Sequence, residues 1–151
     1  ALPISGDADI VLVTNADSVV LAPLEGLWPL LARPEVDAVV VGVEVDDTAR
    51  FGSLVVSGAG RLEGFREKVP GRGLINAGLY AFKRRTLERF PTTRPLSLER
   101  EVFPALLAAG ADIRVLGVAA PFLDMGTPES LAQAEGFVRR NWGSVGMEAA
   151  Q

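Results

Sequence analysis

Asp37-Ala38-Val39-Val40-Val41-Gly42-Val43-Glu44-Val45 decides the fold class, because such an apolar run is typical of a strand buried on both faces of a parallel sheet. A similar run extends from Asp9 to Val13. Between the two, residues 21–32 have the apolar spacing of a helix, which Pro29 should kink or shorten. Strand, helix and strand at this spacing predict a βαβ unit and therefore a sheet that is at least partly parallel.

The rest of the chain predicts further elements of one α/β unit, with no internal repeat and no linker. Ser97 is expected to cap a helix whose first turn holds Glu99 and Glu101, a pattern also typical of a plain charge-balanced helix start. The other expected elements are a hairpin over 51–56 and 61–65, strands over 74–82, 112–118 and 121–124, and helices over 83–89 and 127–140.

The ends of the chain are interpreted separately from this domain, which we expect over residues 9–141. Residues 1–8 are expected to be a disordered or non-native leader, because Ala1-Leu2-Pro3-Ile4 matches the translation of a sequencing adapter. Residues 142–151 are expected to form a frayed tail. A doubly wound domain usually begins with a strand that carries its phosphate loop, and the first strand here carries none, which suggests an N-terminal truncation.

The composition narrows the chemistry by what it lacks. The 151 residues carry a net charge of −4, without the basic excess that nucleic acids or anionic membranes require of a partner. The chain has no cysteine and no histidine, which excludes thiolate nucleophiles, Ser-His-Asp triads and His-ligated zinc. Carboxylates, Lys, Arg, hydroxyls and a hard metal ion remain, a set that suits phosphoryl and nucleotidyl transfer.

Two aspartates follow predicted strands at the edge of the sheet where α/β domains bind ligands. Asp17 ends Thr14-Asn15-Ala16-Asp17, and Asp124 ends Phe122-Leu123-Asp124. From position alone each is better explained locally, Asp17 by an Asx turn and Asp124 by a turn or a helix entry. As a pair in a chain without basic excess, they predict a Mg²⁺ site in a shared crevice.

A second group of polar residues lies in or before the strand over 74–82. Glu67-Lys68 combines an acceptor with a charge suited to phosphate, although a solvated charge pair at a sheet edge is the commoner arrangement. Asn76 lies in an otherwise apolar strand, where a buried amide needs partners, and Gly78 leaves room for a ligand or another backbone. A bulge in the strand would explain both residues as well.

In this order the segments resemble the sugar-phosphate nucleotidyltransferase family over residues 9–140. The resemblance rests on five stretches: Leu12–Asp17, Phe51–Lys68, Leu74–Tyr80, Ser97–Pro104 and Phe122–Glu129. The residues around Asn76, Glu99 and Asp124 are most similar to guanylyltransferases that act on mannose 1-phosphate or manno-heptose 1-phosphate. The implied fold is a Rossmann-like α/β domain of the nucleotide-diphospho-sugar transferase type, with a mixed, mostly parallel sheet, flanking helices and its first strands missing.

The resemblance also implies a reaction. A sugar 1-phosphate oxygen would attack the α-phosphate of an NTP to give NDP-sugar and pyrophosphate, with GTP and a manno-configured sugar as the implied substrates. Asp17 and Asp124 would hold Mg²⁺ between the phosphates, and Lys68 would bind the sugar phosphate. These three residues form the expected catalytic set, and Mg²⁺ is the expected cofactor.

The same resemblance assigns the sugar contacts. Glu67 and Asn76 would contact sugar hydroxyls, Gly78 would let the sugar approach the strand, and Glu99 would be a further contact.

The sequence departs from the family in three places. Ala16 stands where the family usually has glycine, and Val69 separates Glu67-Lys68 from Pro70. The Gly-rich signature that wraps the triphosphate in the family is absent from these 151 residues. We therefore expect the isolated chain to be inactive and only marginally stable.

Other classes of function stay open at this point. One is a non-catalytic nucleotidyltransferase-like module that senses sugar nucleotides or regulates a partner. Another is a related glycosyltransferase, with Asn15-Ala16-Asp17 as an incomplete metal motif, and a third is a fragment without a function of its own. The expected partners are an NTP and a sugar 1-phosphate, without nucleic acid or membrane, and a homo-oligomer is left open. No signal sequence or membrane-spanning run is found, so a cytoplasmic protein is expected.

Overall fold

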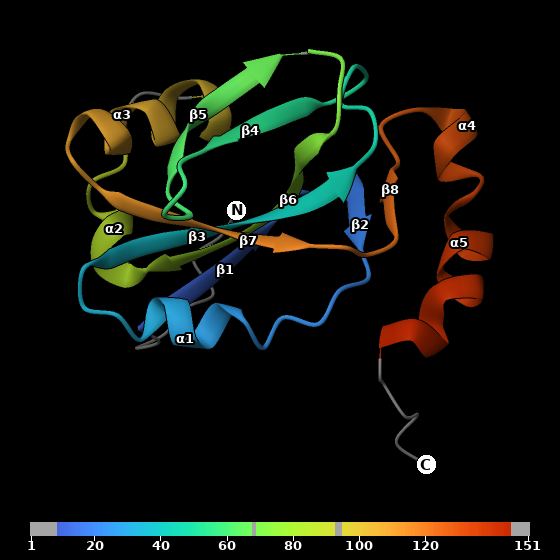
Figure 1. The fold of residues 1–151 in the computed structure, drawn as a ribbon, viewed down its shortest axis with the longest axis horizontal. Helices are drawn as coiled ribbons and strands as arrows, with labels where there is room; N and C mark the ends of the chain where they lie inside the picture. The colour runs from blue at the N-terminus through green and yellow to red at the C-terminus, as the bar shows by residue number, and fades with distance from the viewer. Residues whose placement is uncertain (1–8, 68, 93–94, 146–151) are drawn as a thin grey trace.

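The central feature of the fold is a mixed sheet of six strands (Figure 1). The computed structural model describes residues 9–67, 69–92 and 95–145. The two longest strands, β3 (Val36–Val45) and β6 (Gly73–Lys83), pair antiparallel at the centre of the sheet. The outer edge of β3 pairs with β7 (Asp112–Val118), in parallel.

The other edge of β6 is shared by two neighbours. β1 (Ile10–Thr14) pairs with the C-terminal half of β6. β4 (Gly52–Val56) pairs with β6 at Ile75, and the other edge of β4 pairs with β5 (Leu62–Glu67). β1 and β3 both run antiparallel to β6, so β1, β3 and β7 point in the same direction.

The mixed α/β fold predicted from the apolar runs is therefore confirmed. Within the described residues β3–β7 is the parallel ladder, while the ladders that β6 makes with β1, β3 and β4 are antiparallel. A mostly parallel sheet was expected, whereas the ladders of this sheet in the described residues are mostly antiparallel. A run of buried residues reports burial on both faces and does not report strand direction.

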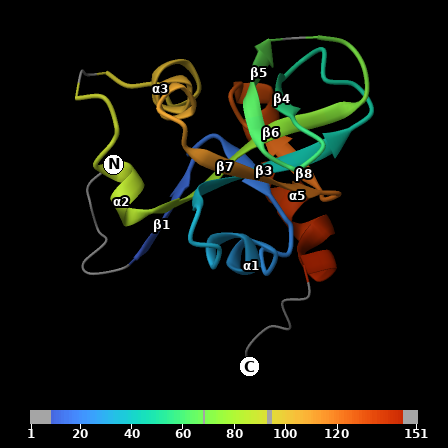
Figure 2. The same cartoon turned by 60° about the vertical axis from the view of Figure 1, so that its left-hand side comes forward.

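Helices cover both faces of the sheet (Figure 2). On one face lies α3 (Phe103–Ala108), which continues from one π-helical turn, η1 (Leu98–Val102). On the other lies α1 (Leu27–Leu31). Alternate residues of β6 serve the two faces, as expected for a strand. Tyr80 and Phe82 belong to the core under α3, and Ala77 and Ala81 to the core over α1.

Several expected element ends agree with the structure. The hairpin is formed by β4 and β5, and α2 (Arg84–Leu87) occupies the predicted helix after β6. Ser97 caps η1, because its side chain accepts from the backbone N of Arg100 at 3.2 Å. Gly110 follows α3 with a φ of 76°, a left-handed conformation that favours glycine.

Two predicted helices differ from the structure. The helix expected over 21–32 is reduced to α1, because residues 21–24 have no regular structure and the chain turns just before α1, where the backbone N of Leu27 donates to the carbonyl O of Leu24 at 3.0 Å. A short strand that was not expected, β2 (Ser18–Val20), precedes this segment. The helix expected over 127–140 is divided into α4 (Pro128–Leu131) and α5 (Ala134–Asn141). Figure 1 shows both at the side of the molecule, beyond β8 (Phe122–Asp124).

The expectations for the chain ends fall mostly outside the described residues. This holds for the leader at 1–8 and for 146–151 of the tail, whereas η2 (Trp142–Val145) is one 3₁₀ turn that follows α5. None of the helices in the described part of the chain is long and apolar enough to cross a bilayer.

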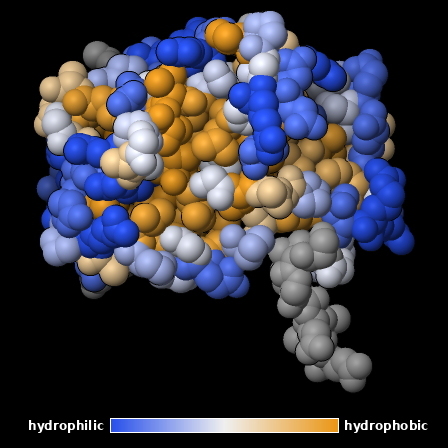
Figure 3. All heavy atoms as spheres, in the orientation of Figure 1, coloured by the Kyte–Doolittle hydropathy of each residue, from blue (hydrophilic) through white to orange (hydrophobic). Residues whose placement is uncertain are grey.

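β1 is less buried than its apolar sequence predicted. Among the described residues β1 pairs with β6 alone, and the side chain of Leu12 is 52% exposed. The expectation of burial on both faces is wrong for this strand, because its second edge has no neighbour in the part of the chain described. Figure 3, in the orientation of Figure 1, shows a different feature: the side of the molecule that carries β7 has a broad apolar area in its middle, with hydrophilic side chains around it.

An ionic cluster at the start of β3 fixes α2 and β7 to the sheet. The buried carboxylate of Asp37 accepts from the backbone N of Asp112 at 3.1 Å and lies 3.3 Å from Arg85 and 3.4 Å from Arg89. Asp37→Ala should lower the free energy of unfolding by about 2–4 kcal/mol, because it leaves a buried N–H unpaired. Urea denaturation measures the change, and Glu35→Ala, which removes an exposed acid nearby, is the control. Equal losses in the two variants would contradict the expectation.

Candidate functional site

The backbone pairing of β2 with β8 brings the two predicted metal ligands together. Ser18 lies opposite Asp124 in this antiparallel ladder, and the backbone N of Met125 donates to the carbonyl O of Asp17 at 2.6 Å. Asp17 and Asp124, which are far apart in the chain, are therefore neighbours across two short strands. This ladder was not predicted, although the strand over 121–124 was.

Both carboxylates keep free oxygen atoms. Oδ1 of Asp17 accepts from the Ser18 hydroxyl at 3.4 Å, and Oδ1 of Asp124 accepts from the backbone N of Gly126 at 2.8 Å. The latter bond is the Asx turn that was weighed as a structural explanation, and it occurs at Asp124 and not at Asp17. Oδ2 of each aspartate has no protein partner among the described residues, and both side chains belong to exposed residues.

This arrangement is chemically suited to a hard cation. Mg²⁺ prefers oxygen ligands and usually takes one or two carboxylates, with water and substrate phosphates completing its coordination. No described Lys or Arg lies within ion-pair distance of either aspartate. Among the described residues no group of three or more acidic side chains forms a complete cage.

Asn76 and Glu99, both predicted sugar contacts, lie together on the α3 side of the sheet. Nδ2 of Asn76 donates to Oε1 of Glu99 and, at 2.7 Å, to the hydroxyl of Tyr80. Oδ1 of Asn76 accepts from the backbone N of Gly78 at 3.1 Å. The amide that is disfavoured in an apolar strand therefore has partners for both of its Nδ2 protons and for Oδ1, which explains how the strand tolerates it.

Tyr80 connects this pair to the aspartate side. Burial raises the pKa of Tyr80 to about 12, and the negative charges of Glu99 and Asp17 also raise it, while hydrogen bonding with Asn76 and Asn15 acts in the opposite direction. The hydroxyl therefore lies in the field of carboxylates from both halves of the site. A phenol with this pKa stays protonated at neutral pH and acts as a neutral hydrogen-bonding group.

The conformation and surroundings of Gly78 require glycine, whether or not a ligand binds there. Its φ is 70°, and a Cβ atom there would lie 2.8 Å from Nδ2 of Asn15. The backbone N of Asn15 donates to the carbonyl O of Gly78 at 2.7 Å. The room at Gly78 is thus taken by the turn that leads to Asp17, and an approach of the sugar to this strand stays a prediction.

No contact among the described residues joins Glu67 to this cluster. Glu67 is an exposed residue at the end of β5, paired with Gly52 of β4, and Lys68 lies outside the described residues. The loop after it is held by Thr48, whose buried hydroxyl donates to the carbonyls of Val69 and Gly71.

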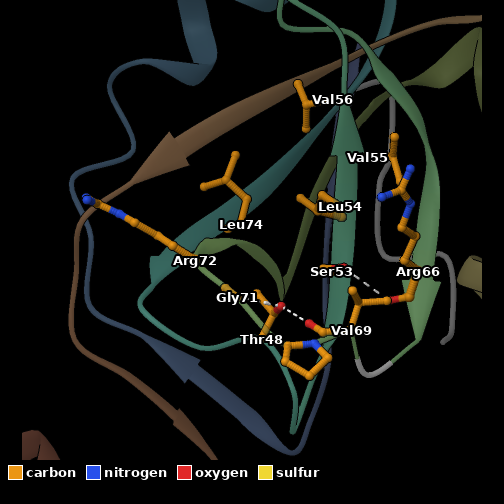
Figure 4. A pocket seen from close by; sticks show the side chains of 12 residues that line it. Thr48, Ser53, Leu54, Val55, Val56, Arg66, Val69, Gly71, Arg72 and Leu74 are labelled. Carbon is orange, nitrogen blue, oxygen red and sulfur yellow. Dashed lines mark hydrogen bonds between the residues drawn. The ribbon is translucent and has the colours of Figure 1, made fainter.

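A hollow of about 370 Å³ lies beside this loop, and it is not the predicted site (Figure 4). It is lined by residues of β4, β5 and the loop before β6, and it contains none of Asp17, Asn76, Glu99 or Asp124. Arg66 and Arg72 lie on opposite sides of it in Figure 4, and Arg72 pairs with Glu44 at 2.8 Å. Its charged groups do not converge on one point, so it makes no second candidate site.

Sequence reasoning missed Tyr80 and Asn15 as members of the site. A signal was present, because Asn76 and Tyr80 are four residues apart in one predicted strand, a spacing that places two side chains on the same face. A buried tyrosine also usually finds a partner for its hydroxyl. The contact of Asn15 with Gly78 could not be read from the sequence, because it depends on the pairing of β1 with β6.

Gly78→Ala should disturb both the strand and the turn. The new methyl group would meet the Asn15 side chain at 2.8 Å on a backbone with a φ of 70°, so we expect a loss of about 2–4 kcal/mol in unfolding free energy. Gly58→Ala is the matched control, because a Cβ there meets nothing within 4 Å. Thermal and urea denaturation of both variants measure the loss of unfolding free energy. A loss for Gly78→Ala no larger than that for Gly58→Ala would rule the clash out.

Comparison with known proteins identifies relatives of one kind. The family model described as nucleotidyl transferase matches residues 2–141. A mannose-1-phosphate guanylyltransferase from Mycobacterium tuberculosis is 38% identical over 129 residues, which are 83% of this chain and 36% of that protein. The crystal structure of HddC from Yersinia pseudotuberculosis superposes with a TM-score of 0.71 at 28% identity, over 87% of this chain and 56% of that one.

A second structure of the same HddC, in complex with GMP-PN, superposes with a TM-score of 0.70 at 27% identity, over 87% of this chain and 56% of that one. The chain thus spans about a third of the length of the guanylyltransferase and just over half of the HddC chain.

Proposed function

Because the chain belongs to the nucleotidyl transferase family, we propose that it forms part of the catalytic domain of a sugar-1-phosphate nucleotidyltransferase. The reaction joins a sugar 1-phosphate to the α-phosphate of an NTP and releases pyrophosphate. The observation that carries the proposal is the meeting of Asp17 and Asp124 on the β2–β8 ladder.

In this proposal Asp17 and Asp124 hold Mg²⁺. The free oxygen atoms of both aspartates and the lack of a described basic partner support the assignment. When bound, the cation would neutralise the phosphate charge that builds up during nucleotidyl transfer. The part played by the chain itself is to fix the two carboxylates relative to each other by backbone hydrogen bonds across the ladder.

The sugar would lie on the α3 side of the sheet, against Glu99 and Asn76. Glu99 offers Oε2, which has no protein partner among the described residues, as an acceptor for a sugar hydroxyl. Glu67 contacts another hydroxyl in this proposal, Lys68 binds the sugar phosphate as a point charge, and Gly78 lies beneath the sugar.

GTP and a manno-configured sugar phosphate are the substrates we propose to test first. The support for them comes from the relatives, which include a mannose-1-phosphate guanylyltransferase and a protein solved with GMP-PN. The alternative is a non-catalytic module that binds sugar nucleotides, and Ala16, directly before Asp17, is the feature that favours it. A methyl group at this position would narrow the space for a nucleotide.

The test uses the protein encoded by the full gene. It is incubated with Mg²⁺, a panel of NTPs and mannose 1-phosphate or manno-heptose 1-phosphate, and pyrophosphate release is followed. Release that requires both substrates and stops on addition of EDTA is the expected result. A folded protein that releases no pyrophosphate with any pair, but binds an NDP-sugar in calorimetry, would favour the sensing module. The 151-residue chain is assayed in parallel and is expected to be inactive.

A further inference from the structure

Tyr80 places one polar atom inside an otherwise apolar core. It is 1% exposed, and its ring packs against the rings of Phe103 and Phe82, with centroid distances of 5.4 Å and 6.3 Å. A phenylalanine ring would fill this space equally well, so packing does not explain the hydroxyl. The hydroxyl accepts the 2.7 Å hydrogen bond from Asn76.

The amide of Asn76 is fixed by protein partners on both of its ends. An amide nitrogen has two protons, and here one goes to Tyr80 and the other to Oε1 of Glu99. The oxygen Oδ1 accepts from the backbone N of Gly78. The amide of Asn76 in turn orients the Glu99 carboxylate, because its hydrogen bond fixes Oε1 and leaves Oε2 as the free acceptor.

We propose that Tyr80 is a positioning residue for the sugar, acting through Asn76 on Glu99. The inference rests on the proposed function and adds to it a residue that touches no substrate. Without the Tyr80 hydroxyl one Nδ2 proton of Asn76 loses its partner, and the amide no longer has a reason to keep the rotamer that holds Glu99. Glu99 then has to be ordered by the sugar itself, which weakens sugar binding.

The kinetic test compares the full-gene protein with Tyr80→Phe, a substitution that keeps the ring and removes the oxygen atom. We expect the KM for the sugar 1-phosphate to rise about five- to tenfold, with the KM for the NTP and kcat changed less than about twofold. Phe82→Leu is the matched control, since it alters the same core without touching a polar atom. This control should lower stability and leave the KM for the sugar unchanged.

A double-mutant cycle separates positioning from general damage. If Tyr80 acts through Asn76, Tyr80→Phe should have no further effect on the sugar KM in an Asn76→Ala background. Equal effects in both backgrounds would overturn the proposal. So would a Tyr80→Phe protein with an unchanged sugar KM, or one whose KM for the NTP rises as much as that for the sugar.

A second measurement does not require catalysis. The asparagines of the chain are Asn15, Asn76 and Asn141, so ¹⁵N-asparagine labelling gives few side-chain amide signals. In Tyr80→Phe the Asn76 amide protons should exchange with solvent at least about tenfold faster, while those of Asn141 stay unchanged.

Titration of the labelled protein with mannose 1-phosphate should also shift the Asn76 signal. The Kd obtained from this shift should be lower for the wild type than for Tyr80→Phe. If the wild type binds the sugar phosphate but releases no pyrophosphate, the proposed function fails while the positioning inference stands. If the Asn76 signal does not respond to any sugar phosphate, the positioning inference is overturned.

Discussion

Asp17→Ala in the full-gene protein should lower kcat/KM for pyrophosphate release by at least about a hundredfold, because removal of a direct metal ligand costs more than disturbing its surroundings. Asp17 has no structural duty of comparable size. It is exposed, and its side chain makes a single 3.4 Å hydrogen bond, to Ser18. The unfolding midpoint of the variant should therefore stay close to that of the wild type, so that lost activity reports lost chemistry.

Asp124→Asn separates the metal site from the Asx turn that Asp124 forms with the backbone N of Gly126. Asparagine forms an Asx turn as readily as aspartate but carries no charge. A metal site predicts that Asp124→Asn is nearly as inactive as Asp124→Ala, whereas a turn alone predicts that Asp124→Asn keeps nearly full activity. Asp46→Ala, which removes an exposed acid just past β3, is the control for net charge and should be active. Asp124→Ala combined with Asp17→Ala should cost little more than either alone, as expected for residues that act as one unit.

Most of the sheet could be predicted because its strands are defined by local sequence. The apolar run at residues 37–45 became β3, and turn-forming residues at 57–60 correctly placed the hairpin of β4 and β5. What failed depended on partners distant in the chain. β2 has only three residues, a run too short to be assigned as a strand from its own sequence, and it is defined by its pairing with β8.

The candidate site shows the same division. Asp17 and Asp124 were predicted because each follows a strand, and Asn76 because an amide is out of place in an apolar strand. Tyr80 was passed over because a tyrosine in such a strand needs no explanation until its hydroxyl is seen against Asn76. Its role depends on η1, which brings Glu99 to the strand from 23 residues away.

Phe103→Ala should have the largest effect on stability. Phe103 is completely buried at the start of α3, and its ring lies within 6 Å of three others: 5.5 Å from Phe65, 5.4 Å from Tyr80 and 5.8 Å from Phe82. Truncating a buried phenylalanine to alanine typically costs about 3–5 kcal/mol, from lost burial and the cavity left behind. Since small domains are stable by about 5–15 kcal/mol, the 151-residue chain should lose most of its cooperative urea transition.

Two further variants make this result specific to packing. Phe103→Leu keeps part of the side-chain volume and should cost clearly less than alanine, whereas Trp28→Ala removes a larger aromatic that is 52% exposed and should cost under about 1 kcal/mol. Phe103 also directly follows η1, the turn that carries Glu99. In the full-gene protein Phe103→Leu should therefore raise the KM for the sugar phosphate more than the KM for the NTP. A stable Phe103→Ala protein with an unchanged urea midpoint would show that α3 is held to the sheet by something other than this aromatic cluster.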